Sequence, residues 1–238
     1  MRVVSVDGGL KDNAIPVESF AVVVVSDEKK AREALEKFGD DLKNEYRTPD
    51  PDVTLCVESA APAVLPMTNA DSEKVVTLLT CMPNGLIELS MDVAGLPQTS
   101  LNLGILTTSE NEVSASFCVR SSVSSQKEML KKRLTRMTAL LGGTVSYFGE
   151  YPAWEFKSDS PILKLCADVY EKKFGKKPVI TAIHGGLECG LFSEKMPGLD
   201  CVSFGPDIFD IHTPREKLSV SSLNRTWEFL LEVLKEMK

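Results

Sequence analysis

Two largely apolar segments of strand length, Val179–Ile183 and Leu199–Phe204, constrain most strongly what this chain can fold into. Strands of this kind are typical of parallel sheets that helices cover on both faces. Helical patterns flank them over Ser160–Phe174 and Ser219–Lys238. Two strands are too few to make the sheet of an α/β domain. We therefore expect residues 153–238 to be an α/β segment whose sheet takes further strands that this chain does not contain.

Residues 1–152 have a different pattern, in which apolar and polar side chains alternate within strands. Val113–Val119 alternates most clearly, which indicates a strand with one face toward a core and one toward solvent. Val4–Val25 and Leu101–Val119 share the order strand, turn, strand, which indicates two similar repeats. These features predict an α+β domain of ferredoxin-like repeats, with helices on one face of an antiparallel sheet. Further strands are expected at Arg2–Asp7, Ser19–Val25, Val53–Val57, Leu86–Val93, Thr99–Leu106 and Thr144–Phe148. Helices are expected at residues 27–46, 71–82 and 124–141. We expect the domain boundary at residues 152/153.

Composition excludes several classes of protein. The 238 residues include 34 acidic and 27 basic side chains, so the net charge is −7, which argues against a nucleic-acid partner. No stretch approaches the roughly 18 apolar residues that a membrane-spanning helix needs, and no signal-peptide pattern is present. The six cysteines are scattered without a CxxC pair, which indicates reduced and mostly buried thiols. The sequence therefore predicts a cytoplasmic protein that binds neither nucleic acid nor membranes.

One of the two histidines, His184, starts a glycine-rich turn between a predicted strand and a short helix that ends at Lys195. Gly185 and Gly186 would let a ligand approach the backbone, and free N–H groups at a helix N-terminus attract anions such as a substrate carboxylate. The same residues also fit a sharp turn with a surface histidine. The oxyanion hole of a lipase-like hydrolase fits poorly, because the chain has no Gly-x-Ser-x-Gly string.

The second histidine, His212, lies in a loop two residues before Pro214. A neutral imidazole is a common metal ligand, and Asp210 or Glu216 could orient it. One histidine does not make a metal site, since a catalytic zinc needs about three protein ligands. Cys189, near the start of the helix after His184, could be a thiol nucleophile if a base were paired with it; a packed thiol is the alternative.

Two further polar residues stand out at the ends of predicted elements. Arg120 ends an alternating strand beside Ser121 and Ser122, an arrangement that suits a carboxylate clamp and equally suits a solvated arginine. Asn13 lies in a turn before Pro16 and on its own indicates turn chemistry. The basic residues of the helix over 124–141 are typical of a solvated face.

Six short strings of residues carry a resemblance to a known family. They occur in the same order in aminoacyl-histidine dipeptidases, also called Xaa-His dipeptidases or peptidase D, of the di-zinc superfamily that includes peptidase T and carnosinase. The chain resembles these enzymes over nearly its whole length. The strings are Asn13–Pro16, Ser100–Gly104, Val119–Ser122, Ile183–Gly190, Ser203–Pro206 and His212–Pro214.

The resemblance implies an organisation and a set of site residues. Residues 1–152 would be the lid and dimerisation domain, and residues 153–238 the C-terminal portion of the catalytic domain, with the N-terminal portion absent. His212 would be the one zinc ligand from this chain, and no catalytic residue would lie in it, because the sequence has no His-x-Asp and no Glu-Glu pair to supply the other ligands and the general base. The substrate-binding residues would be Asn13, Arg120, His184, Gly185, Gly186 and Glu188.

The function that follows is metal-dependent hydrolysis of dipeptides of the aminoacyl-histidine type. Two zinc ions would be bound in the complete enzyme, and none tightly by this chain alone. We expect the chain to be a truncated part that is inactive alone; the alternative is a non-catalytic lid and dimerisation module. The expected partners are a dipeptide substrate, a second copy of the chain and the missing N-terminal part.

Overall fold

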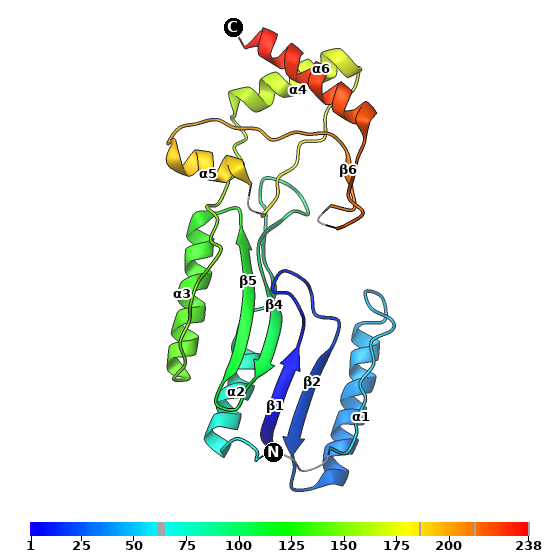
Figure 1. The fold of residues 1–238 in the computed structure, drawn as a ribbon, viewed down its shortest axis with the longest axis vertical. Coiled ribbons are helices and arrows are strands. Elements are labelled where there is room, and N and C mark those ends of the chain that lie inside the picture. Colours follow the sequence, from blue (N-terminus) through cyan, green and yellow to red (C-terminus); the bar gives the residue numbers. More distant parts are fainter. Residues whose placement is uncertain (61–64, 186, 212, 238) are drawn as a thin grey trace. The chain divides into compact units, whose positions relative to one another are not determined.

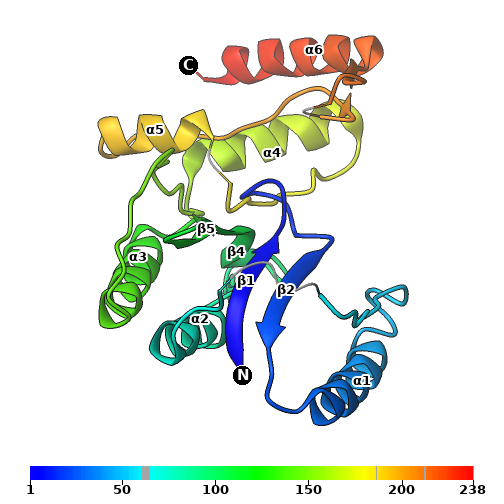
Figure 2. The same cartoon turned by 60° about the horizontal axis from the view of Figure 1, so that its bottom comes forward.

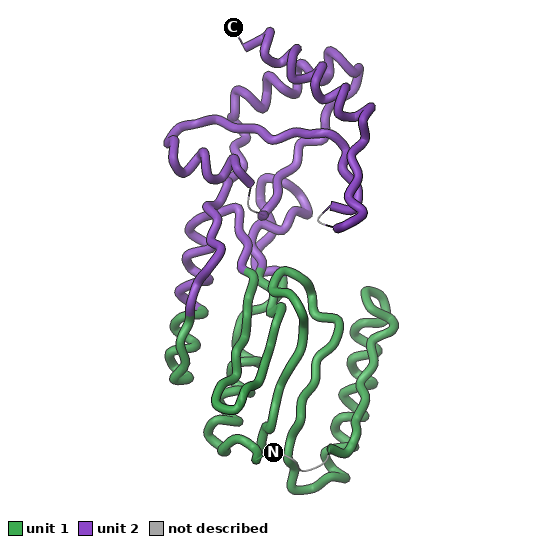
Figure 3. The backbone as a smooth tube through the Cα atoms, viewed as in Figure 1, with its two compact units in different colours: residues 1–85, 101–118, 134–145 green, residues 86–100, 119–133, 146–238 purple. Residues whose placement is uncertain are grey.

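The structure, a computed structural model, describes residues 1–60, 65–185, 187–211 and 213–237 (Figure 1). The chain divides into two compact units (Figure 3). The first unit comprises residues 1–85, 101–118 and 134–145, and the second comprises residues 86–100, 119–133 and 146–238. The predicted domain boundary at residues 152/153 stays a prediction.

An antiparallel sheet begins with β1 (Arg2–Gly8) and β2 (Ser19–Val24), which pair over their whole lengths. Gly8 of β1 also pairs with Leu106 of β4 (Pro97–Thr108), and β3 (Gly85–Leu89) and β5 (Val113–Ser121) pair with β4. The predicted strand–turn–strand order of both repeats is confirmed by β1–β2 and β4–β5. The antiparallel part of the predicted fold class is therefore confirmed.

The core of the first unit forms between β1 and helix α2 (Asn69–Cys81) (Figure 2). Val3 and Val6 are buried against Val75 of the helix. Alternate positions of a strand point to one face, so Val3 and Val6, three apart, share this core only because the register shifts between Val3 and Ser5. The backbone N–H of Val3 donates to the hydroxyl of Ser72 at 2.9 Å, which ties the helix to the strand.

Helix α1 (Glu28–Glu45) begins as the sequence predicts. The Asp27 side chain accepts a hydrogen bond from the backbone N–H of Lys30 and caps the first turn. No residue of this helix is buried, and Arg32 contacts the neighbouring segment through the carbonyl of Val57. That segment was predicted as a strand over Val53–Val57; this prediction is wrong, because these residues have no strand pairing.

Helices α4 (Pro161–Phe174) and α6 (Val220–Glu236) pack side by side and make the core of the second unit (Figures 1 and 2). The buried residues are Cys166 and Val169 of α4 with Phe229 and Val233 of α6. Phe204 packs edge-on against Phe229, with ring centroids 4.9 Å apart. The second unit also contains most of β3, the adjoining ends of β4 and β5, and the first part of α3 (Ser124–Leu140). Its remaining elements are α5 (Glu188–Lys195), β6 (Ile208–Phe209) and β7 (Lys217–Leu218).

The predicted α/β sheet of residues 153–238 does not form within the described residues. Val179–Ile183 and Leu199–Phe204 have no strand pairing, and the same is true of Thr144–Phe148. A strand needs hydrogen-bonded neighbours, and these apolar segments have none there. From residue 153 onward the only described ladder is the short antiparallel pair β6–β7. None of the helices in the described parts is long and apolar enough to cross a membrane.

Candidate functional site

Two buried hydroxyls fix the ends of β4 and β5 in the second unit. Thr99 and Ser121 are both buried, and their hydroxyl oxygens lie 2.8 Å apart in a hydrogen bond. Successive side chains of a strand point to opposite faces. Ser100 and Arg120, the neighbours of this buried pair, therefore lie together on the other face. Their placement follows from the residue pattern of Thr99-Ser100 and Arg120-Ser121.

On that face the structure brings His184 to Ser100. The Nε2 atom of His184 lies 3.0 Å from the hydroxyl oxygen of Ser100, in a hydrogen bond between residues 84 apart in sequence. Partial burial lowers the pKa of His184 below its ordinary value, and the positive charge of Arg120 lowers it further. The imidazole is therefore neutral at pH 7, with one nitrogen held by a hydroxyl. Sequence reasoning used Ser100 only as part of a string and missed this contact.

The Arg120 guanidinium is exposed, and no described carboxylate pairs with it. A cation next to a neutral imidazole and a hydroxyl can bind an anion through several hydrogen bonds at once. Within the described residues, the structure thus brings two predicted binding residues, Arg120 and His184, together with Ser100, which the sequence did not single out.

The glycine turn beside this cluster is only partly described. Gly185 is not among the glycines with a positive φ, and an added Cβ there would meet only Ile183, at an ordinary 3.6 Å. A sharp turn therefore does not explain a glycine at this position. Glu188 is exposed at the first position of α5, where a negative charge is favourable. Gly186 lies outside the described residues.

Asn13 belongs to the first unit, in a loop held against β4. The side-chain amide of Asn102 donates to the carbonyls of Asp12 at 2.9 Å and Ala14 at 2.8 Å, so it grips the backbone on both sides of Asn13. Gly104 leaves room for this loop, because a Cβ there would lie 2.3 Å from the carbonyl oxygen of Asp12. The Ser-Leu-Asn-Leu-Gly string thus contributes two residues that position Asn13.

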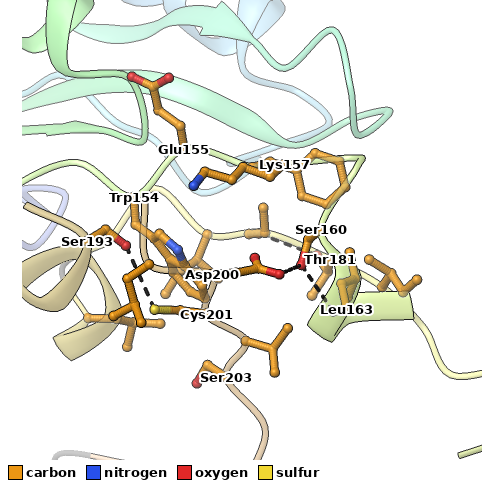
Figure 4. A pocket seen from close by; sticks show the side chains of 17 residues that line it. Trp154, Glu155, Lys157, Ser160, Leu163, Thr181, Ser193, Asp200, Cys201 and Ser203 are labelled. Carbon is orange, nitrogen blue, oxygen red and sulfur yellow. Dashed lines mark hydrogen bonds between the residues drawn. The ribbon is translucent and has the colours of Figure 1, made fainter. Parts of the chain in front are cut away.

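A cavity of about 210 Å³ lies in the second unit (Figure 4). The extended segments 180–183 and 199–203 both line it, together with Trp154 and Lys157. On its wall the carboxylate of Asp200 accepts hydrogen bonds from the Ser160 hydroxyl at 2.9 Å and the Ile162 N–H at 3.0 Å. Burial alone would raise the pKa of Asp200, but these hydrogen bonds and the charge of Lys157 outweigh it and hold that pKa below its ordinary value.

The predicted metal ligand, His212, lies outside the described residues. Within residues 1–60, 65–185, 187–211 and 213–237, no group of three or more His, Cys, Asp or Glu side chains could hold a metal ion. The described residues therefore do not by themselves fit a metal. Burial, with the nearby Cys201 and Glu188, raises the pKa of the Cys189 thiol, so its thiolate is a minor form at neutral pH and Cys189 does not suit a catalytic nucleophile that must act at every turnover.

Comparison with known protein families matches residues 7–236 to the family described as Peptidase family M20/M25/M40. The chain belongs to this family. It is 34% identical to the cytosol non-specific dipeptidase of Escherichia coli (strain K12), over all of this chain and 49% of that protein. It is also similar to the crystal structure of aminoacylhistidine dipeptidase from Vibrio alginolyticus, with a TM-score of 0.91 and 35% identity, again over all of this chain and 49% of the other.

A more distant likeness concerns the fold alone. Aminopeptidase PepT from Bacillus cereus matches 69% of this chain with a TM-score of 0.52 and 20% identity, over 44% of its own chain. The resemblance to aminoacyl-histidine dipeptidases that the sequence motifs carried is confirmed. This M20 chain spans about half the length of the dipeptidases it matches.

Proposed function

We propose that the chain is part of a metal-dependent dipeptidase and that Arg120 binds the carboxylate of the dipeptide. The observation that carries this proposal is an exposed guanidinium, without a carboxylate partner among the described residues, beside the hydrogen-bonded pair Ser100–His184. A planar guanidinium binds a carboxylate through two parallel hydrogen bonds. The neutral His184 adds a hydrogen-bonding group without adding a second charge.

The remaining substrate contacts belong to the same proposal. Gly185 and Gly186 would let the substrate lie against the backbone, with Glu188 after them. Asn13 would be a further contact, supplied by a loop that Asn102 holds. Substrates would be dipeptides of the aminoacyl-histidine type, as the name of the Vibrio alginolyticus relative suggests.

The chemistry would need groups that this chain supplies only in part. His212 would be its single zinc ligand, and when bound the two zinc ions would activate water and polarise the peptide carbonyl. The sequence has two histidines, no His-x-Asp and no Glu-Glu pair. We therefore propose that the general base and the other ligands come from another polypeptide segment, and that this chain alone is inactive and holds no zinc tightly.

The proposed domains follow the same logic. Residues 1–152 would be the lid and dimerisation domain, and residues 153–238 the C-terminal portion of the catalytic domain. The partners would be the complementary N-terminal portion and a second copy of this chain. The extended segments that line the cavity of the second unit support the first of these partners, because within the described residues they pair with no strand and an added strand could pair with them.

The carboxylate site can be tested by NMR on the isolated chain. We expect an aminoacyl-histidine dipeptide to shift the ring signals of His184, and the same dipeptide with its C-terminus amidated to leave them unchanged. Arg120→Gln should abolish the shift, and Arg133→Gln, an exposed arginine on α3, should not. Equal shifts with the amide, or a full shift in Arg120→Gln, would refute a carboxylate clamp.

Turnover tests the proposal that the chain is inactive alone, and the carboxylate-dependent shift separates the enzyme part from the alternative, a non-catalytic lid and dimerisation module. The zinc-loaded chain should not hydrolyse His-containing dipeptides, and equilibrium dialysis should find no tightly bound zinc. Hydrolysis by the chain with one or two bound metals would overturn the proposal that it is inactive alone. A carboxylate-dependent shift without turnover favours the enzyme part. The absence of both the shift and turnover favours the module.

A further inference from the structure

Two cysteines of the second unit lie close together. Cys189 is in the first turn of α5, and Cys201 is in the extended segment that follows this helix. Cys189 and Ser193 are four residues apart and so share one face of this helix. The Ser193 hydroxyl donates to the Cys201 sulfur at 3.9 Å, and the Cys189 thiol donates to the carbonyl of Val202 at 4.0 Å. Both contacts join this face of α5 to the adjacent residues Cys201 and Val202. Cys201 also lies close enough to contribute to the raised pKa of the Cys189 thiol.

The two thiols differ in access. Cys201 is half-buried and lines the cavity of about 210 Å³, next to Asp200 and Ser193 (Figure 4). Cys189 is also half-buried but is not part of the cavity wall. Small molecules that enter the cavity therefore reach Cys201 first. Among the other cysteines, Cys166 is buried in the α4–α6 core, and Cys56, Cys81 and Cys118 lie elsewhere in the chain.

We propose that Cys189 and Cys201 form a reversible internal disulfide when the protein meets a low-molecular-weight disulfide such as glutathione disulfide. The Cys201 thiolate attacks one sulfur of glutathione disulfide, forms a mixed disulfide and releases one glutathione thiolate. The Cys189 thiolate then attacks the Cys201 sulfur, forms the internal bond and releases the second glutathione. The two protons lost by the protein thiols go to the two departing glutathione thiolates, so two protein thiols are oxidised and one disulfide is reduced.

This disulfide would join the first turn of α5 to the extended segment that carries Cys201. Helix α5 directly follows the turn of His184 and Gly185, so the bond would restrain that turn from its C-terminal side. The modification does not depend on the proposed dipeptide chemistry, and its readout is the covalent state of the protein.

The experiment is peptide mapping after oxidation of the folded chain with glutathione disulfide. A Cys56→Ser/Cys81→Ser background removes the two exposed thiols that would cross-link separate chains. Lys195 lies between the two cysteines, so trypsin separates their peptides and only a disulfide keeps them joined. We expect the joined pair to be the main oxidised product and dithiothreitol to release it.

Matched variants assign the bond. Cys189→Ser should leave Cys201 as a mixed disulfide with glutathione, while Cys201→Ser should leave Cys189 largely unmodified, and either should lower the joined peptide at least tenfold. Cys118→Ser, a half-buried cysteine outside the cluster, should change nothing. Circular dichroism confirms that each variant is folded. Glutathione adducts on both cysteines without the joined peptide, or no oxidation of either, would overturn the proposal.

Discussion

At the scale of single residues, the chemistry of the second unit depends on one imidazole next to one guanidinium. Burial and Arg120 both favour the neutral form of His184, and Ser100 holds its Nε2 atom in place. Because the pKa of His184 is lower in the folded state than its ordinary value of 6.5, its contribution to the free energy of unfolding is fully present at pH values above 6.5. That stabilisation is lost as the pH falls through the lower, folded-state pKa, because the unfolded chain takes up the proton first.

The first prediction concerns the charge of Arg120. Arg120→Gln removes one of the two causes of the lowered pKa and leaves the burial of His184, so the pKa should rise and stay below 6.5. The measurement is an NMR titration of the His184 ring protons, assigned with a His184→Asn variant. Arg133→Gln is the control and should leave the titration unchanged. An unchanged pKa in Arg120→Gln would show that the two side chains do not interact.

The contact between Ser100 and His184 marks a limit of prediction at this scale. Arg120 and His184 were each found from a local pattern, a strand-end arginine beside hydroxyls and a glycine turn. The contact between Ser100 and His184 could not be found in this way, because it depends on the packing of segments 84 residues apart. Once the structure shows that Thr99 and Ser121 are buried, strand alternation accounts for Ser100 and Arg120 on one face.

At the scale of elements, local signals decided which predictions held. Helices were predicted at residues 27–46 and 219–238, and α1 and α6 confirm them; Asp27 and Ser219 cap these helices, and an N-cap acts within one turn of its own helix. The strands predicted at Val179–Ile183 and Leu199–Phe204 are not formed, because apolar character favours a strand but only a neighbouring strand completes it. The sequence therefore predicts helices and hairpins here, but it does not predict which strands distant in the sequence pair with each other.

The second prediction belongs to the start of α4. Asp200 accepts from the hydroxyl of Ser160 and the N–H of Ile162, and Ser160 caps the helix by accepting from Leu163. Asp200→Asn removes the negative acceptor and should cost about 1–2 kcal/mol of unfolding free energy, since it weakens two hydrogen bonds to a charged group. Urea unfolding at pH 7 measures this loss.

A double-mutant cycle separates Asp200 from the serine cap. Ser160→Ala alone should cost about 1 kcal/mol. Because the two side chains share a hydrogen bond, the double variant should lose less than the sum of the single losses. Additive losses would mean that Asp200 and Ser160 act independently, and a loss below about 0.3 kcal/mol in Asp200→Asn would mean that its hydrogen bonds do not hold α4.

At the scale of the whole molecule, the chain leaves apolar side chains of extended segments without cover among its described residues. Val179 is 92% exposed, and Ile180 and Ile183 in the same segment are also exposed. An apolar segment with unpaired backbone groups is a template for pairing with another chain. This surface supports the proposals of a second copy or a complementary portion as partner.

The third prediction follows from this surface. In sedimentation velocity at micromolar concentration, the chain should sediment as species larger than the monomer. Val179→Lys should shift it toward the monomer, because a lysine on an unpaired segment opposes edge-to-edge pairing. Val17→Lys is the matched control: Val17 is also 92% exposed, but it lies in the loop between β1 and β2 and should not alter the distribution. A concentration-independent monomer for the unaltered chain, or equal shifts in both variants, would show that Val179–Ile183 is not where the chain associates.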